Sequence, residues 1–85
     1  MTYFIVDKDL IDDGLLNGRT YGGEQAPEGV EPTRFRLYDD DNILYFEGRA
    51  WLRPDDSGFE MQDSLGYSYG CTSTKLLEKG KWNIL

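Results

Sequence analysis

The sequence contains no histidine, and Cys71 is its single cysteine. Without histidine, no side chain has an ordinary pKa near neutrality, and the hydroxyl and thiol groups lack the base that usually activates a nucleophile. One cysteine cannot form a disulfide within the chain, and it leaves zinc without its usual set of ligands. We therefore expect a protein that is not an enzyme and that carries no metal or cofactor.

Long apolar runs are also missing. No stretch approaches the roughly 20 apolar residues that a transmembrane helix needs. Residues 1–7 contain no basic group and end on an acid, which is unlike a signal peptide. A lone cysteine fits a reducing compartment. The sequence therefore predicts a cytoplasmic protein that makes no contact with membranes.

The acidic clusters do not match a known catalytic or calcium-binding pattern. A calcium loop of the EF-hand type needs acids at positions 1, 3 and 5 and a glycine at position 6. Counting from Asp39, positions 5 and 6 are Ile43 and Leu44; counting from Asp7, position 5 is Ile11. Turn carboxylates are also poor general acids, because exposure to water keeps their pKa low. The acids are therefore read as turn formers and as surface charge.

Acidic residues are what the chain has in excess. Sixteen acids against nine bases give a net charge of −7. This charge favours solubility and repels nucleic acid, and it would attract a partner with a basic surface. Phosphates of one DNA strand lie roughly 6–7 Å apart, about the spacing of alternate residues in a strand, so carboxylates on turns and strands can imitate a phosphate track. Composition leaves two interpretations open, acidity for solubility and acidity for recognition.

The hydrophobic pattern predicts a single domain, 1–85, that is mainly β, or α+β with one or two short helical turns. Four or five short strands built from hairpins should form a small antiparallel sheet. A helical turn after Asp7 or Asp9, residues 59–65 as strand or helix, and a Gly- and Pro-rich surface loop at 19–32 complete the prediction. The strands are expected at 3–6, 33–38, 43–51, 71–78 and 81–85.

The clearest element is the hairpin between residues 33 and 51. Pairing Tyr38 with Ile43 across the polar turn Asp39–Asn42 sets Phe35 opposite Phe46. In that register apolar residues share one face and charged residues share the other, as a half-buried antiparallel pair requires. The apolar face would hold Phe35, Leu37, Leu44 and Phe46, and the polar face Arg34, Arg36, Tyr45 and Glu47. The last two strands should pair through Glu78 with Lys81 and Leu77 with Trp82.

Candidate partner-binding residues follow from exposure. The hairpin tip projects Asp39, Asp40 and Asp41, and a second turn carries Asp55 and Asp56. Tyr67 and Tyr69 lie between glycines in a predicted loop, where alternate positions can both point outward; the alternative is that one of the two rings caps the core. Acids steer association, and buried aromatics usually supply most of the affinity.

Two stretches resemble small acidic proteins of phages, plasmids and actinobacterial genomes. The first is the hairpin Arg36-Leu37-Tyr38-Asp39-Asp40-Asp41 with Tyr45-Phe46-Glu47-Gly48. The second is the tail, with Phe59-Glu60, Asp63, Gly66-Tyr67, Gly70-Cys71-Thr72, Gly80-Lys81-Trp82 and Leu85. The resemblance covers roughly residues 34–85 and names no activity. It implies a setting in which small acidic proteins often inhibit host defence, anti-CRISPR proteins among them.

The resulting hypothesis is a small binding protein encoded by a mobile element. It would inhibit or modulate a bacterial nucleic-acid-handling protein through its acidic surface, without binding nucleic acid itself. Two alternatives remain: an accessory or structural domain that is acidic for solubility alone, and an immunity protein that neutralises a toxin.

Overall fold

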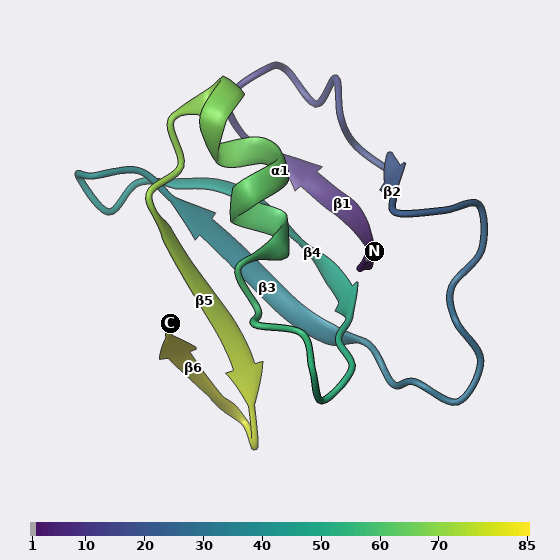
Figure 1. Ribbon diagram of the computed structural model, residues 1–85. Helices are drawn as coiled ribbons and strands as arrows, with labels where there is room; N and C mark the ends of the chain where they lie inside the picture. The colour runs from purple at the N-terminus through teal and green to yellow at the C-terminus, as the bar shows by residue number, and fades with distance from the viewer. Residues whose placement is uncertain (1) are drawn as a thin grey trace.

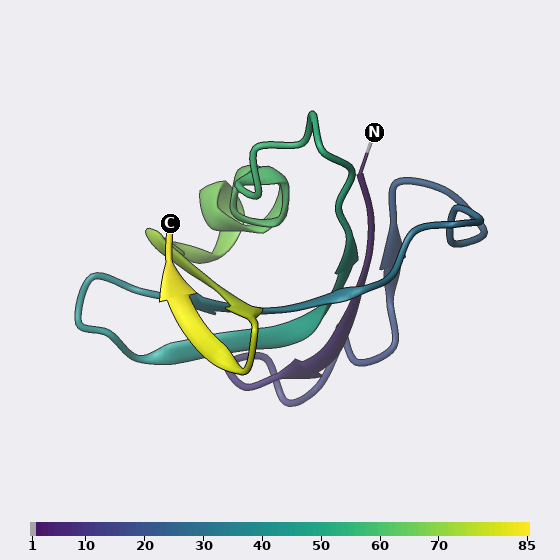
Figure 2. The same cartoon turned by 90° about the horizontal axis from the view of Figure 1, so that it is seen from below.

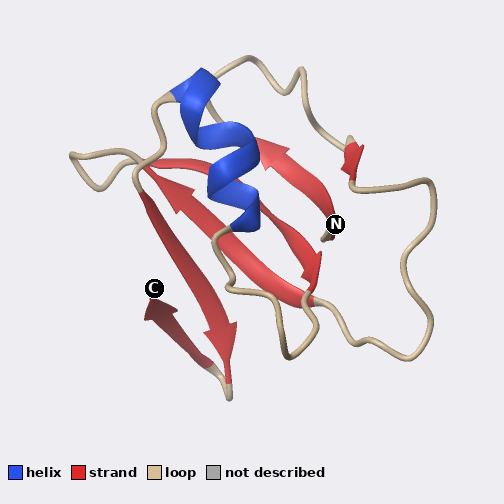
Figure 3. Cartoon of the chain, viewed as in Figure 1, coloured by secondary structure: helices blue, strands red, loops and turns tan. Residues whose placement is uncertain are grey.

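The computed structural model describes residues 2–85 and shows one antiparallel sheet with a single helix against it (Figures 1 and 3). The mainly β prediction is confirmed, with six strands where four or five were expected. The elements, in chain order, are β1 Tyr3–Asp9, β2 Thr20–Tyr21, β3 Thr33–Tyr38, β4 Leu44–Trp51, α1 Glu60–Tyr69, β5 Ser73–Glu78 and β6 Lys81–Ile84.

The additional strand is β2, which lies inside the segment predicted as a surface loop. It pairs with β1 through Phe4 and Tyr21, whose rings stack with centroids 4.6 Å apart. Residues 22–32 have neither helix nor strand and are mostly exposed. The predicted loop is therefore interrupted, because an aromatic side chain at position 21 gains more by covering the core than by remaining in water.

The strands lie in the order β2-β1-β4-β3-β5-β6. Since β4 and β5 are both antiparallel neighbours of β3, they run parallel to each other. Such a connection needs a crossover, and α1 supplies it (Figure 1). The terminal strands pair as expected, with Leu77 opposite Trp82 and Glu78 opposite Lys81.

The core fills the space between α1 and the sheet, which curves around the helix (Figure 2). We call this side of the sheet the inner face. Its alternate residues are almost fully buried, and the helix contributes Met61 and Leu65. From the strands come Phe4, Val6, Phe35, Leu37, Phe46, Ala50 and Leu76.

The hairpin register differs from the predicted one. Leu37 lies opposite Phe46, and Phe35 lies opposite Gly48, a shift of two residues. The first step arises at the turn, where Asp39 N–H donates to the Ile43 carbonyl at 3.1 Å, so the hairpin closes at Asp39 rather than at Tyr38. The second step is a bulge in β4, which leaves Tyr45 as an extra residue.

Because the two one-residue shifts in register add up to two, the residues beyond the bulge still point to the predicted sides of the sheet. Phe35, Leu37 and Phe46 are all buried, as predicted. At the bulge the prediction is wrong: Leu44 lies opposite Tyr38, and Tyr45 packs against the core. Alternation by two cannot detect a bulge, because the bulge is the point where the alternation breaks.

The segment after β4 contains another error in secondary structure. Gly66–Gly70, predicted as a loop, is the second half of α1 and its C-cap. The helix begins beside Glu60, whose carboxylate accepts hydrogen bonds from the Ser57 and Gly58 N–H groups at 2.9 and 2.8 Å. Partial burial raises the pKa of Glu60, but the hydrogen bonds to its carboxylate lower the pKa by more, so the net shift is downward. The helix ends at Gly70, which takes the left-handed conformation (φ 79°) and donates to the Gly66 carbonyl at 2.7 Å.

The turn after β1 is organised by one buried carboxylate. Asp9, rather than Asp7, accepts hydrogen bonds from three backbone N–H groups, those of Ile11, Asp12 and Leu16, at 3.0–3.1 Å. Of the four aliphatic residues in this turn, Leu16 is buried in the core. The other three, Leu10, Ile11 and Leu15, are exposed.

Among residues 2–85, no helix has the length and apolar character needed to cross a membrane.

Candidate binding surfaces

The predicted acidic tip has two different kinds of carboxylate. Asp39 is a turn former: its carboxylate accepts the N–H groups of Asp41 and Ile43 at 2.9 and 2.8 Å. It also accepts a hydrogen bond from the phenol of Tyr45, which raises the pKa of Tyr45. Asp40 and Asp41 point into water. These two are therefore the residues of the tip that are available to a partner.

The two tyrosines do not act together. On an α-helix, side chains two residues apart point to nearly opposite sides of the helix axis, whereas in a loop both could point outward. Tyr67 is 99% exposed, while Tyr69 packs edge-to-face on Phe46, with ring centroids 5.2 Å apart. The expectation that both point outward is wrong, and Tyr69 belongs to the core.

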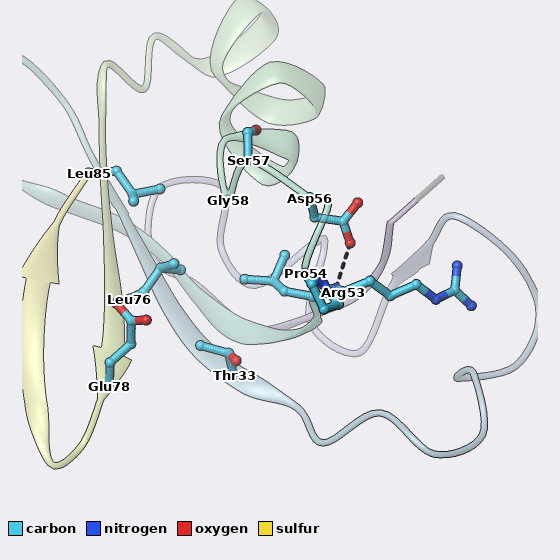
Figure 4. A pocket seen from close by; sticks show the side chains of 10 residues that line it. Thr33, Arg53, Pro54, Asp56, Ser57, Gly58, Leu76, Glu78 and Leu85 are labelled. Carbon is cyan, nitrogen blue, oxygen red and sulfur yellow. Dashed lines mark hydrogen bonds between the residues drawn. The ribbon is translucent and has the colours of Figure 1, made fainter.

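The second acidic turn borders a pocket of about 410 Å³ next to the start of α1 (Figure 4). Asp56 lines it, but its carboxylate accepts the Arg53 N–H at 2.8 Å and so closes the turn. Leu76 and Leu85 form the apolar wall on the opposite side (Figure 4). Asp55 is exposed. The pocket therefore offers a mixed lining in which Asp56 already has a structural role.

The fold separates these candidates. The turn Asp39–Asn42 precedes β4 and the turn that contains Asp55 and Asp56 follows it, so the two turns lie at opposite ends of this strand (Figure 1). The C-terminal end of α1 lies at the same end of the sheet as the hairpin tip, and the Thr72 N–H donates to the Tyr38 carbonyl at 2.8 Å. Asp40, Asp41 and Tyr67 can therefore belong to one surface, whereas Asp55 and Asp56 cannot belong to it.

The interior offers little reactive chemistry. Cys71 lies in the core, where burial, assisted by the negative charge of Asp39, raises the pKa of its thiol to about 11. The thiol is therefore protonated at neutral pH, and a protonated thiol is a poor nucleophile. Within the part of the chain that the structure describes, no three acidic or sulfur side chains gather as metal ligands would.

A further surface was not among the predicted candidates. On the face of the sheet away from α1, which we call the outer face, five of the nine basic residues project from β1, β3, β4 and β5. Asp7 and Glu47 are the acids on these strands that share the face. The basic set is Lys8, Arg34, Arg36, Arg49 and Lys75.

Aromatic rings accompany these cations. Arg36 lies 4.0 Å above the ring of Trp82, and Arg34 lies 5.6 Å from the same ring. Arg49 lies 5.9 Å from the ring of Trp51, and the ammonium of Lys75 lies 4.6 Å from the ring of Tyr38. Such contacts hold the cations in place on a surface that would otherwise leave long side chains free to move.

The two ion pairs of residues 2–85 also lie on the outer face. Arg36 Nε donates to Glu47 at 2.8 Å, and Arg49 donates two hydrogen bonds to Asp7 at 2.9 and 3.0 Å. The second pair makes the guanidinium a still weaker acid, so the pKa of Arg49 is raised. The face keeps a net positive charge on a protein whose total charge is −7.

Part of this surface was visible in the sequence. The alternation of Arg34 and Arg36 with Phe35 and Leu37 places both arginines on the outward face. Arg49, Lys75 and Trp82 join them through strand pairing, which brings together residues that are up to 48 positions apart. Comparisons of the chain with protein-family models, with curated proteins and with solved structures find no match.

Proposed function

We propose that this protein is a cytoplasmic binding protein that occupies the basic surface of a bacterial nucleic-acid-handling protein and so inhibits or modulates it. The observation that carries the proposal is that exposed carboxylates and an exposed aromatic ring lie at the same end of the sheet (Figure 1). Asp40 and Asp41 are exposed at the hairpin tip, and Tyr67 is 99% exposed near the end of α1. Carboxylates steer a basic partner from a distance, and an exposed aromatic becomes buried when the partner docks.

The distribution of charge supports this choice. Fourteen of the sixteen acidic residues lie away from the outer face, and in residues 2–85 none of them forms an ion pair. Most lie on turns and loops, as Asp12, Asp40, Asp55 and Glu28 do. Asp9, Asp39, Asp56 and Glu60 accept backbone N–H groups and so stabilise the fold. The exposed carboxylates outside this group are desolvated and paired only when a basic surface arrives, so they contribute to association.

The first prediction concerns the acids of the tip. The double change Asp40→Lys and Asp41→Lys should slow association with the partner roughly tenfold and flatten its salt dependence. Asp39 is left unchanged because it holds the turn. The partner is first captured from a nuclease-treated bacterial lysate and eluted with salt, and association rates are then measured with the purified pair.

The matched control is Glu24→Lys with Glu28→Lys, which changes the net charge equally in the segment after β2, where both side chains are exposed. If the two double variants associate equally slowly, net charge alone matters and the tip is not the site. A duplex oligonucleotide should displace the protein from its partner; coexistence of all three in one complex would contradict inhibition by occupation of a nucleic-acid site.

The second prediction concerns the aromatic anchor. Tyr67→Ala should speed dissociation of the same complex by roughly tenfold or more while the fold is kept, because the ring makes almost no contact within the free protein. Dissociation rates from surface plasmon resonance provide the measurement. Phe59→Ala is the control, since Phe59 is a partly exposed aromatic at the opposite end of α1. An unchanged off-rate for Tyr67→Ala would remove this residue from the site.

A further inference from the structure

We infer that the outer face of the sheet is a second binding surface, and that its ligand is a carboxylate-rich segment of another protein. This inference is independent of the proposed function, which uses the acidic end of the molecule. No helix or strand among residues 2–85 covers the outer face, whereas the inner face carries α1 (Figure 2). Of its basic side chains, Lys8, Arg34 and Arg49 are exposed and Arg36 and Lys75 are half-buried.

Like charges lie directly opposite each other on this surface. Arg34 is the cross-strand neighbour of Arg49, and Arg36 is the neighbour of Lys75. Such pairs destabilise a sheet, since directly opposed cations repel. A fold that tolerates two of them violates a local rule of sheet stability, and such violations are expected at functional sites.

The internal acids balance only part of this charge. Glu47 pairs with Arg36 and Asp7 pairs with Arg49. In the described part of the chain, Arg34, Lys75 and Lys8 form no ion pair. Arg34 is the cross-strand neighbour of Arg49 and lies 5.6 Å from the ring of Trp82, and its hydrogen-bond donors are available to an incoming anion.

The outer face already binds one carboxylate, that of Asp7, in the way we expect it to bind a ligand. Arg49 holds Asp7 through two parallel N–H donors at 2.9 and 3.0 Å, the fork geometry that matches a carboxylate. Stacking on an aromatic ring occupies the flat face of a guanidinium and leaves its edge free for such bonds. Arg36, 4.0 Å from the ring of Trp82, and Arg34, 5.6 Å from it, are both held near this ring, which lowers the conformational entropy that they lose on binding.

Carboxylates fit this surface better than nucleic acid does. Proteins that bind single strands offer bare aromatic rings on which bases stack. Here Trp82, Trp51 and Tyr38 already have cations over them. The acidic residues elsewhere on the molecule would also repel a long polyanion. A short acidic segment is repelled less, because it can contact the outer face without reaching those residues. Half-buried Ile5 and Leu77 lie on the same face and offer apolar contact to such a segment.

The test uses a peptide of ten glutamates as the probe. Trp51 and Trp82 are the two tryptophans of the chain and both lie on the outer face, so intrinsic fluorescence reports on the surface directly. We expect a saturable fluorescence change at low salt that disappears at high salt. Arg34→Gln should weaken peptide binding roughly tenfold, because one charge-assisted bidentate contact is lost.

Arg53→Gln is the matched control, since it removes the same charge from an exposed side chain in the turn after β4, beyond the strands that form the outer face (Figure 4). Its affinity should stay within about twofold of the parent protein. The inference is overturned if the peptide gives no saturable change. Equal weakening by both variants would likewise overturn it, as would tighter binding of a single-stranded decathymidylate than of the peptide.

Discussion

Replacing Phe46 by alanine is expected to lower the free energy of unfolding by about 3–5 kcal/mol. The side chain is fully buried, lies opposite Leu37 and meets the ring of Tyr69 edge-to-face. Its removal opens a cavity between the sheet and α1, and it also takes away the contact that docks the end of the helix. A small domain has about 5–15 kcal/mol in total, so the variant should be close to unfolding at ambient temperature.

Urea denaturation followed by far-UV circular dichroism measures this loss. Ile43→Ala in the same hairpin is the control, because Ile43 is 55% exposed and its removal should cost below about 1 kcal/mol. A loss at Phe46 as small as that of the control would mean that Phe46 does not face the core.

Gly48→Ala is expected to be at least as damaging, although it adds a single methyl group. Gly48 is not in the left-handed region, so the requirement is for space rather than for an unusual conformation. A Cβ at this position would lie 2.0 Å from the Ile5 carbonyl oxygen and 2.7 Å from the ring of Phe35. Neighbouring strands would have to separate, and we expect a loss above about 3 kcal/mol or failure to fold, since overpacking beside backbone cannot relax by a rotamer change.

Gly80→Ala distinguishes this steric effect from the general cost of replacing glycine. Gly80 has φ 77° in the turn before β6, and a Cβ there would meet nothing within 4 Å. Its replacement should cost about 1 kcal/mol through backbone strain alone. Thermal and urea melts of the two variants side by side provide the comparison, and equal losses would refute the steric explanation for Gly48.

The two hairpins show what local pattern can and cannot predict. Between β5 and β6, the turn is short and the predicted pairing of Leu77 with Trp82 is correct. Between β3 and β4, the closing pair and the Tyr45 bulge each move the register by one residue. The inward residues were identified correctly because burial depends on the parity of the register, and two successive shifts leave the parity unchanged.

Gly66 and Gly70 favour a loop in the sequence, where the structure has the C-terminal part of α1. Gly70 is indeed where the helix ends. Gly66 lies inside the helix, where a Cβ would come within 2.7 Å of the Cys71 carbonyl oxygen, so a glycine that weakens the isolated helix permits the chain to turn closely back on it. The Ser-x-x-Glu spacing of Ser57 and Glu60 could have favoured a helix here, since the Glu60 carboxylate accepts the Ser57 N–H just before the helix begins.

Alternating apolar residues and turn formers determined a mainly β fold, the strand positions and the inward face of the central hairpin, since these depend on neighbours a few residues apart. Composition likewise determined the net negative charge and the lack of a side chain with an ordinary pKa near neutrality. Distant pairing decided the rest: the place of β2 beside β1, the burial of Tyr69 on Phe46, and the joining of Arg34, Arg49 and Trp82 into one basic surface. Such contacts depend on strand order and on a crossover helix, and a sequence encodes these through the packing of the whole core rather than through any local pattern.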